Sequence, residues 1–191
     1  MATSPDKSGS CEAIVLFSGG IDSLACIHLL RSRNLTVSGL FVNYSQAAGK
    51  QEELAVAMLS QLLSIQVCHL RMDGFGCFSA GELPGRNSLL ISAALFASRR
   101  RSCLIGMGIH SGTGYYDCSQ QYLDSMNMLV SAQSDGHVSI VAPFLNWTKQ
   151  DIYDYAIAER LPIAHTYSCE NGTHPTCGLC ASCRDRKVLG C

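Results

Sequence analysis

Two groups of residues in this sequence have the types and the spacing that chemistry requires. The first is the string Ser18-Gly19-Gly20-Ile21-Asp22-Ser23, which follows the apolar run of residues 13–17 and opens a helical pattern. A glycine turn between a strand and a helix points backbone N–H groups into a concave site, and the helix dipole adds to the attraction for an anion. The string therefore predicts a phosphate-binding turn, although the spacing to a Gly-Lys-Ser/Thr of a Walker A motif is absent.

The second group is a set of four cysteines near the C-terminus, Cys169, Cys177, Cys180 and Cys183, spaced C-x7-C-x2-C-x2-C. Four thiolates suit a closed tetrahedral zinc site with no open position for a water nucleophile, so the predicted site is structural. An iron–sulfur cluster also uses four thiolates and is an alternative, as is His174 in place of one cysteine. The rest of the eleven cysteines are scattered singly, which favours metal binding over a disulfide framework.

The elements that must position these groups alternate along the chain. Hydrophobic periodicity predicts strands over 13–17, 36–43, 65–72, 103–108 and 138–142, and helices over 22–30, 52–63, 86–101, 120–134 and 148–159. This order predicts an α/β fold, a parallel sheet flanked by helices on both faces, with ligands at the carboxyl ends of the strands. Ser18, Asn43 and Gly106 fall near such ends. The pocket for a nucleotide and the acceptor pocket, in which the second substrate would bind, should therefore share that edge.

Finer expectations concern helix caps and core positions. Thr148 is the expected N-cap of the helix over 148–159. The residues expected in the core on the third strand are Val67, Cys68 and Leu70. Those expected in the core on the helix over 86–101 are Leu89, Leu90, Ala93, Ala94, Phe96 and Ala97.

Length and composition indicate one globular domain. We expect a polar, disordered leader over residues 1–10, a nucleotide-binding α/β domain over 11–160, and a zinc-binding element over 161–191 packed on the same domain. The 191 residues are 47% hydrophobic and 15% charged and contain no run of 18 apolar residues, so we expect a cytoplasmic protein without a membrane span. A net charge of -1 argues against a nucleic-acid surface.

The string over residues 18–23 resembles the PP-loop of the ATP pyrophosphatases, which adenylate an oxygen of their substrate and release pyrophosphate. With the cysteine cluster added, the chain is similar over nearly all its length to the QueC-type 7-cyano-7-deazaguanine synthases. Five segments carry this resemblance: residues 18–23, Val42-Asn43-Tyr44-Ser45-Gln46, Leu83-Pro84-Gly85-Arg86-Asn87, Tyr116-Asp117-Cys118, and Trp147-Thr148-Lys149-Gln150-Asp151-Ile152.

The resemblance implies an ATP-dependent carbon–nitrogen ligase of queuosine biosynthesis. ATP would activate the carboxylate of 7-carboxy-7-deazaguanine as an acyl adenylate, and ammonia would convert the adenylate to an amide. A second adenylation followed by elimination would then give the nitrile. The implied cofactors are ATP, Mg2+ and Zn2+, and the implied assembly is a homodimer.

Residue roles follow by matching motif positions. Adenylation builds negative charge on the phosphates, which the loop amides and the cations Arg86 and Lys149 are suited to stabilise. Both cations open helices, where positive charge is unfavourable unless it serves a ligand. The expected catalytic residues are Ser18, Asp22, Ser23, Arg86 and Lys149, with Asp22 also holding Mg2+. The expected nucleotide site adds Phe17, Gly19, Gly20, Ile21 and Gly106, and the expected substrate residues are Tyr44, Gln46, Asn87 and Asp117.

The chain departs from the synthase pattern in two segments. The synthases usually continue from Gln46 into Arg-His, where this chain has Ala47-Ala48, and they usually carry arginine and glutamate where it has Ser119 and Gln121. These segments are expected to border the acceptor pocket. An enlarged pocket would admit a larger amine, such as the N-terminus of a partner protein, and the reaction would then stop at a substituted amide.

Two further alternatives remain open. A PP-loop tRNA thiolation enzyme would use a cysteine or a cluster to deliver sulfur, but the net charge and the closed cysteine spacing weigh against it. A non-catalytic ligand-binding descendant is the other, and the complete loop with Arg86 and Lys149 argues against that one.

Overall fold

The computed structural model describes residues 12–191 with the exception of 75, 80, 100 and 113. The expected leader over 1–10 lies outside the described residues. Within them, every helix falls short of the length and apolarity that crossing a bilayer requires.

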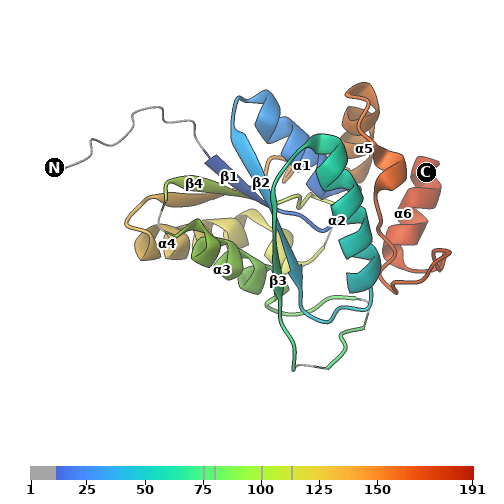
Figure 1. Ribbon diagram of the computed structural model, residues 1–191, viewed down its shortest axis with the longest axis horizontal. Coiled ribbons are helices and arrows are strands. Elements are labelled where there is room, and N and C mark those ends of the chain that lie inside the picture. The colour runs from blue at the N-terminus through green and yellow to red at the C-terminus, as the bar shows by residue number, and fades with distance from the viewer. Residues whose placement is uncertain (1–11, 75, 80, 100, 113) are drawn as a thin grey trace.

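Five parallel strands form the sheet (Figure 1). They are β1 (Glu12–Leu16), β2 (Thr36–Asn43), β3 (Val67–Arg71), β4 (Cys103–Gly106) and β5 (Val138–Val141), in the spatial order β3-β2-β1-β4-β5. The chain moves outward from β1 to β3 and then crosses to the other side of β1. The carboxyl edge between β1 and β4 is therefore the topological switch point, where ligands bind in open α/β sheets.

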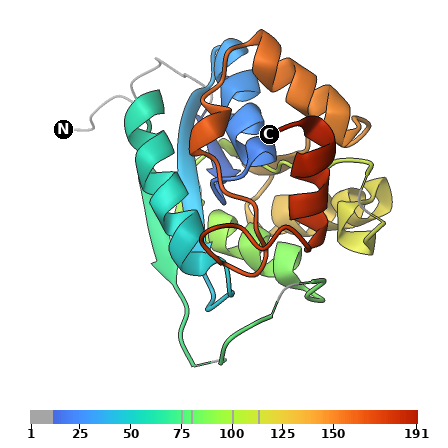
Figure 2. The same ribbon diagram turned by 90° about the vertical axis from the view of Figure 1, so that its right-hand side faces the viewer.

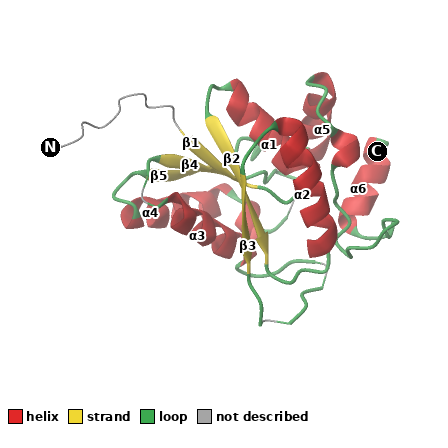
Figure 3. Ribbon diagram, viewed as in Figure 1, coloured by secondary structure: helices red, strands yellow, loops and turns green. Residues whose placement is uncertain are grey.

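Helices cover both faces of this sheet, as the sequence predicts (Figure 3). One face is covered by α1 (Ile21–Ser32), α2 (Gly49–Leu63) and α5 (Lys149–Ala158), and the other by α3 (Arg86–Ser98) and α4 (Gln120–Gln133). Each layer buries its own apolar cluster. Phe17, Leu24 and Phe144 belong to the first cluster, and Ile91 and Ile105 belong to the second.

The C-terminal segment adds two short elements, the 3-10 turn η2 (Ile163–His165) and the helix α6 (Ala181–Leu189), which packs beside α5 (Figure 2). A further 3-10 turn, η1 (Tyr116–Cys118), precedes α4. The sequence predicts a zinc-binding element over 161–191 but not its helix, because the cysteine spacing determines the ligands and not the backbone between and after them.

The N-terminus of α5 is capped as predicted. The Thr148 hydroxyl accepts a hydrogen bond from the Asp151 amide at 3.1 Å, and the Asp151 carboxylate accepts one from the Thr148 amide at 2.8 Å. This reciprocal capping box fixes the first turn of the helix. It also places Lys149, the first helical residue, at the carboxyl edge of the sheet.

Four expected core positions are exposed instead. Cys68 and Leu70 lie on β3, which is an edge strand with a neighbour on one side only. Leu89 and Phe96 are exposed on α3, and Phe96 has 89% of its surface exposed. The expectation is wrong at these positions because apolar periodicity identifies an element without saying how far the next layer extends over it.

Candidate functional site

The turn after β1 has the geometry of an anion site. Gly19 has a φ of 79°, a left-handed conformation that favours glycine, and a Cβ there would lie 2.9 Å from the Ala55 side chain of α2. Gly20 is the N-cap of α1, and its carbonyl accepts a hydrogen bond from the Ser23 hydroxyl at 3.0 Å. In the described part of the chain no backbone carbonyl accepts from the amides of Ser18, Gly19 or Gly20. These amides are available for a bound phosphate.

Asp22 and Lys149 meet beside this turn. Lys149 Nζ donates to both carboxylate oxygens of Asp22, at 2.6 and 2.5 Å, and each side chain is 25% exposed. The two residues are 127 positions apart, and the capped start of α5 and the first turn of α1 bring them together. The site thus pairs an acidic ligand of the kind that Mg2+ prefers with a cation suited to phosphate.

The loop after β4 lies directly against the first turn of α1. A Cβ on Gly108 would lie 2.9 Å from the Asp22 carbonyl carbon and 3.0 Å from the Ser23 amide nitrogen. Only a residue without a side chain permits this approach. Gly106, the glycine expected in the nucleotide site, packs instead against Leu30 and Val15 inside the fold. Its role in binding stays a prediction.

His110 is the site residue that the sequence did not reveal. Its Nε2 lies 3.9 Å from Asp22 Oδ2, and its side chain is 12% exposed. Burial lowers the pKa of His110, the Asp22 carboxylate opposes that shift, and the Lys149 ammonium adds to it. The imidazole is therefore neutral near pH 7. A single histidine in a glycine-rich loop carries no spacing signal, and only the adjacency of β1 and β4 places it here.

A second group of predicted residues surrounds Glu52 on α2. The Gln46 side chain donates to Glu52 Oε2 at 2.7 Å and accepts from the Tyr44 amide at 2.9 Å. Burial raises the pKa of Glu52, and the Gln46 hydrogen bond and the Arg86 charge oppose it. Burial also raises the pKa of Tyr44, while Arg86 lowers it. Tyr44, Gln46 and Arg86 are thus gathered around the Glu52 carboxylate. The main-chain carbonyl oxygen of Glu52 would lie 3.2 Å from a Cβ built on Gly19.

Asn87 and Asp117 form a third contact. The Asn87 side chain is buried and donates from Nδ2 to the Asp117 carbonyl at 3.2 Å. This bond ties the start of α3 to η1. Asn87 therefore has a clear role in holding the loop, and the binding roles of Asn87 and Asp117 remain predictions.

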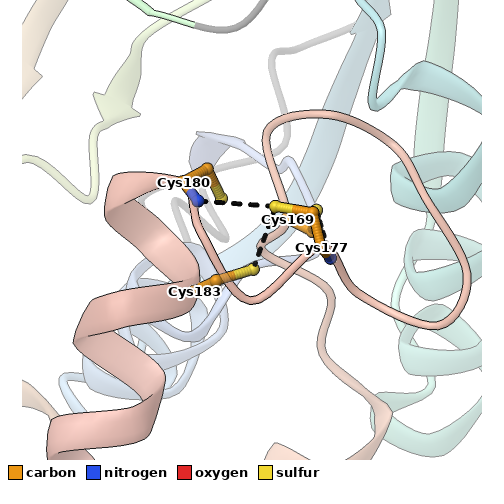
Figure 4. Close-up of side chains that lie close together, drawn as sticks. All are labelled: Cys169, Cys177, Cys180 and Cys183. Atoms are coloured by element: carbon orange, nitrogen blue, oxygen red, sulfur yellow. Dashed lines mark hydrogen bonds between the residues drawn. The ribbon is translucent and has the colours of Figure 1, made fainter.

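The four cysteines converge as the spacing predicts (Figure 4). All four Sγ atoms lie within 4.8 Å of one another, and Cys177 Sγ is 3.9 Å from Cys183 Sγ. A Zn–S length of about 2.3 Å implies sulfur–sulfur edges of about 3.8 Å in a tetrahedron. A small contraction of the cluster would match that geometry, so the donor set fits a tetrahedral divalent ion.

Hydrogen bonds prepare part of this cluster for the thiolate form. Burial raises the pKa of Cys169, but the Cys177 amide and other donors outweigh burial and lower it to about 5. Backbone amides also lower the pKa of Cys177. Burial and the neighbouring thiols raise the pKa of Cys183 to about 12. Four thiolates in this space repel one another, so a bound cation is what would stabilise them together.

The cysteine element is joined to the phosphate turn. The Tyr167 amide donates to the Gly19 carbonyl at 3.0 Å, and Arg186 of α6 donates through Nε to the Ser168 hydroxyl at 3.1 Å. A Cβ on Gly172 would lie 2.0 Å from the Ala47 carbonyl oxygen. The loop that carries the first cysteine therefore rests on both the phosphate turn and one of the two departures from the synthase pattern.

An open groove of about 400 Å³ lies at the other departure. Ser111, Tyr115, Tyr116, Ser119 and Asn146 are among its lining residues, and none of the described lining residues is charged. Ser119 is the N-cap of α4 and accepts a hydrogen bond from the Tyr122 amide at 3.2 Å. Ser111, which lines the groove, is the residue after His110.

Comparison with known proteins shows the family of this chain. The family model described as "Queuosine biosynthesis protein QueC" matches residues 12–83 and 79–188. A 7-cyano-7-deazaguanine synthase of Synechococcus sp. (strain RCC307) is 31% identical, covering 93% of each chain. A 7-cyano-7-deazaguanine synthase 1 of Desulfitobacterium hafniense (strain Y51) is 29% identical, covering 94% of this chain and 91% of the relative.

A solved structure described as a predicted subunit of tRNA methyltransferase from Methanocaldococcus jannaschii shares the fold. It superposes with a TM-score of 0.55 at 13% identity, covering 77% of this chain and 74% of the other. The α/β fold class and the family resemblance are thereby confirmed, while the roles of individual site residues stay predictions.

Proposed function

The chain belongs to the QueC family, and from this premise we propose that it uses ATP to activate the carboxylate of 7-carboxy-7-deazaguanine. The observation that carries the proposal is the Lys149–Asp22 pair beside the open amides of Ser18, Gly19 and Gly20, at the switch point of the sheet. Phosphate, a divalent cation and an acceptor can meet there because β1 and β4 are neighbours.

The chemistry follows from where charge develops. A carboxylate oxygen of the substrate attacks the α-phosphorus of ATP, the bond to the β-phosphate bridging oxygen breaks, and pyrophosphate leaves. The loop amides, Ser18, Ser23 and Lys149 stabilise the charge on the phosphates. Asp22 would hold Mg2+, which supplies further charge neutralisation when bound.

Two later steps complete nitrile formation. Ammonia attacks the acyl carbon, AMP leaves, and a proton passes to solvent, which gives the amide. The amide oxygen attacks the α-phosphorus of a second ATP and pyrophosphate leaves, and loss of AMP with two protons then gives the nitrile. Tyr44, Gln46, Asn87 and Asp117 are the proposed acceptor residues, and Arg86 lies among them beside Glu52.

A second candidate is favoured by the groove at Ser119. The same acyl adenylate would be attacked by a primary amine larger than ammonia, such as a protein N-terminus, and AMP would leave. A substituted amide bears one hydrogen on nitrogen, so it cannot lose the two protons that a nitrile requires, and the product would remain an amide. The uncharged lining and the two tyrosines suit a neutral extended segment.

One experiment separates these candidates. The protein is incubated with Mg2+, ATP, 7-carboxy-7-deazaguanine and ammonia, pyrophosphate release is followed, and products are identified by mass spectrometry. Accumulation of the free nitrile supports the first candidate. Slow or absent nitrile, together with a deazaguanine adduct on an added amine or partner protein, supports the second. If no pyrophosphate is released with this acid, neither candidate stands.

Zinc, homodimer formation and a cytoplasmic location complete the proposal. The four-cysteine cluster would hold Zn2+ as a structural ion, since it leaves no coordination position open. Its proposed task is to hold the 166–172 segment against the phosphate turn.

A further inference from the structure

His110 is placed over the predicted phosphate site by two independent contacts. Because residue 108 is a glycine, the loop after β4 can lie directly against the Asp22–Ser23 peptide. A Cβ built on Gly108 would lie 2.9–3.0 Å from the atoms of this peptide. Three residues further on, the Ser111 amide donates to the Trp147 carbonyl at 3.1 Å, and the Ser111 hydroxyl donates to the same oxygen at 2.7 Å. The loop is thus fixed on both sides of His110.

The direction of the imidazole N–H follows from a hydrogen bond. His110 Nδ1 lies 3.1 Å from the Gly112 amide nitrogen, which donates to it. In the neutral ring Nδ1 must then be the acceptor, and Nε2 carries the hydrogen. Nε2 is the atom on the side of Asp22.

Within the described part of the chain, this N–H has no acceptor of its own. The distance of 3.9 Å to Asp22 Oδ2 is too long for a hydrogen bond, and both Asp22 oxygens already accept from Lys149. No other acceptor for Nε2 is found among the residues that the structure describes. The side chain is 12% exposed, so little water reaches it. A hydrogen-bond donor that is held in place beside an anion site, without a protein acceptor, is positioned to donate to the bound anion.

We propose that His110 is a phosphate-binding residue, donating its Nε2–H to the phosphate chain of ATP and to the pyrophosphate that leaves. This inference rests on the proposed adenylation and adds a residue to it. The hydrogen bond requires no proton transfer, because the negative charge that moves onto pyrophosphate is stabilised by a donor already in place. Lys149 would meet the same phosphates as a charged donor, and His110 as a neutral one.

The conservative variants His110→Gln and His110→Asn differ only in the position of the side-chain amide nitrogen. Glutamine at 110 can place its Nε2 near the position of the histidine Nε2, whereas asparagine ends near the position of Nδ1. We therefore expect His110→Gln to keep ATP–pyrophosphate exchange within about fivefold of the parent, and His110→Asn and His110→Ala to lose about 10–100-fold, the range for a hydrogen bond to a charged group. The KM for the acceptor acid should change little in all three.

A binding measurement keeps the inference separate from the proposed reaction. Calorimetry with MgATP and with magnesium pyrophosphate, without acceptor, should show weaker binding for His110→Asn than for His110→Gln. If the parent shows no exchange with 7-carboxy-7-deazaguanine but this binding difference persists, the proposed substrate fails and the role of His110 stands. Equal binding and equal exchange in the Gln and Asn variants would overturn the role of His110, as would parent-like values for His110→Ala.

Discussion

Replacing Lys149 by methionine should separate catalysis from stability. The side chain keeps most of its length and loses its charge, so the two hydrogen bonds to Asp22 disappear while the start of α5 keeps its capping box. Asp22 is then left as a carboxylate in the first turn of α1, where negative charge is favourable.

The expected stability change is small. Exposed ion pairs contribute about 0.2–1 kcal/mol, whereas removing one partner of a buried pair costs about 3–5 kcal/mol. Both side chains here are 25% exposed, so water can reach the Asp22 oxygens and the cost should lie near 1 kcal/mol. In a chain of this length such a change lowers Tm by about 2–4 °C.

The expected catalytic change is large. Removing one preorganised donor from a developing oxyanion costs about 100–1000-fold in kcat, and Lys149 lies beside the predicted phosphate site through its contact with Asp22. ATP–pyrophosphate exchange measures this rate, and scanning calorimetry measures Tm. Lys50→Met is the matched control, because Lys50 is exposed on α2 and should change neither.

Two results would refute this reasoning. Exchange within about threefold of the parent would show that Lys149 does not face the phosphates. A Tm loss above about 10 °C would show that the pair supports the fold, and the lost activity would then say nothing about chemistry.

The other predictions concern the turn, its neighbour and the cysteines. Ser18→Ala should abolish exchange without lowering Tm, because the side chain is exposed and packs little. Gly108→Ala should lower exchange strongly by pushing its loop off α1, whereas Gly114→Ala, with nothing within 4 Å of its Cβ, serves as the control. Cys180→Ser should remove the metal, about one zinc per chain by elemental analysis, and lower Tm sharply, while Cys68→Ser should do neither. Iron with visible absorbance in the parent would instead revive the tRNA thiolation alternative.

Local patterns were sufficient to predict the five strands, the helices α1 to α5 and the cysteine cluster. Alternating strands and helices specify a parallel sheet, and the Thr148 cap is readable because its partner Asp151 is only three residues away. The cysteines carry their own spacing, so their convergence within 4.8 Å did not depend on knowing the fold around them.

Long-range neighbours were beyond the same reasoning. His110 meets Asp22 because β4 returns to lie beside β1, and strand order is not encoded in the local pattern of either strand. Gly108 was missed for the same reason. Leu70 and Phe96 were expected in the core because periodicity cannot tell an edge strand or an outer helix face from a covered one.

The two departures from the synthase pattern have different structural consequences, which bears on how an acceptor enters. At Ala47-Ala48 the lost bulk does not leave an open space, because Ala48 is buried and the backbone of Gly172 lies against the Ala47 carbonyl. At Ser119 the surface is open, and the groove there reaches Ser111, the residue after His110. An amine larger than ammonia would therefore approach from the α4 side of the sheet edge, and not from beneath the cysteine loop. Substituting Ser119 by arginine, the residue usual in the synthases, should then block a large amine while leaving ammonia free to react.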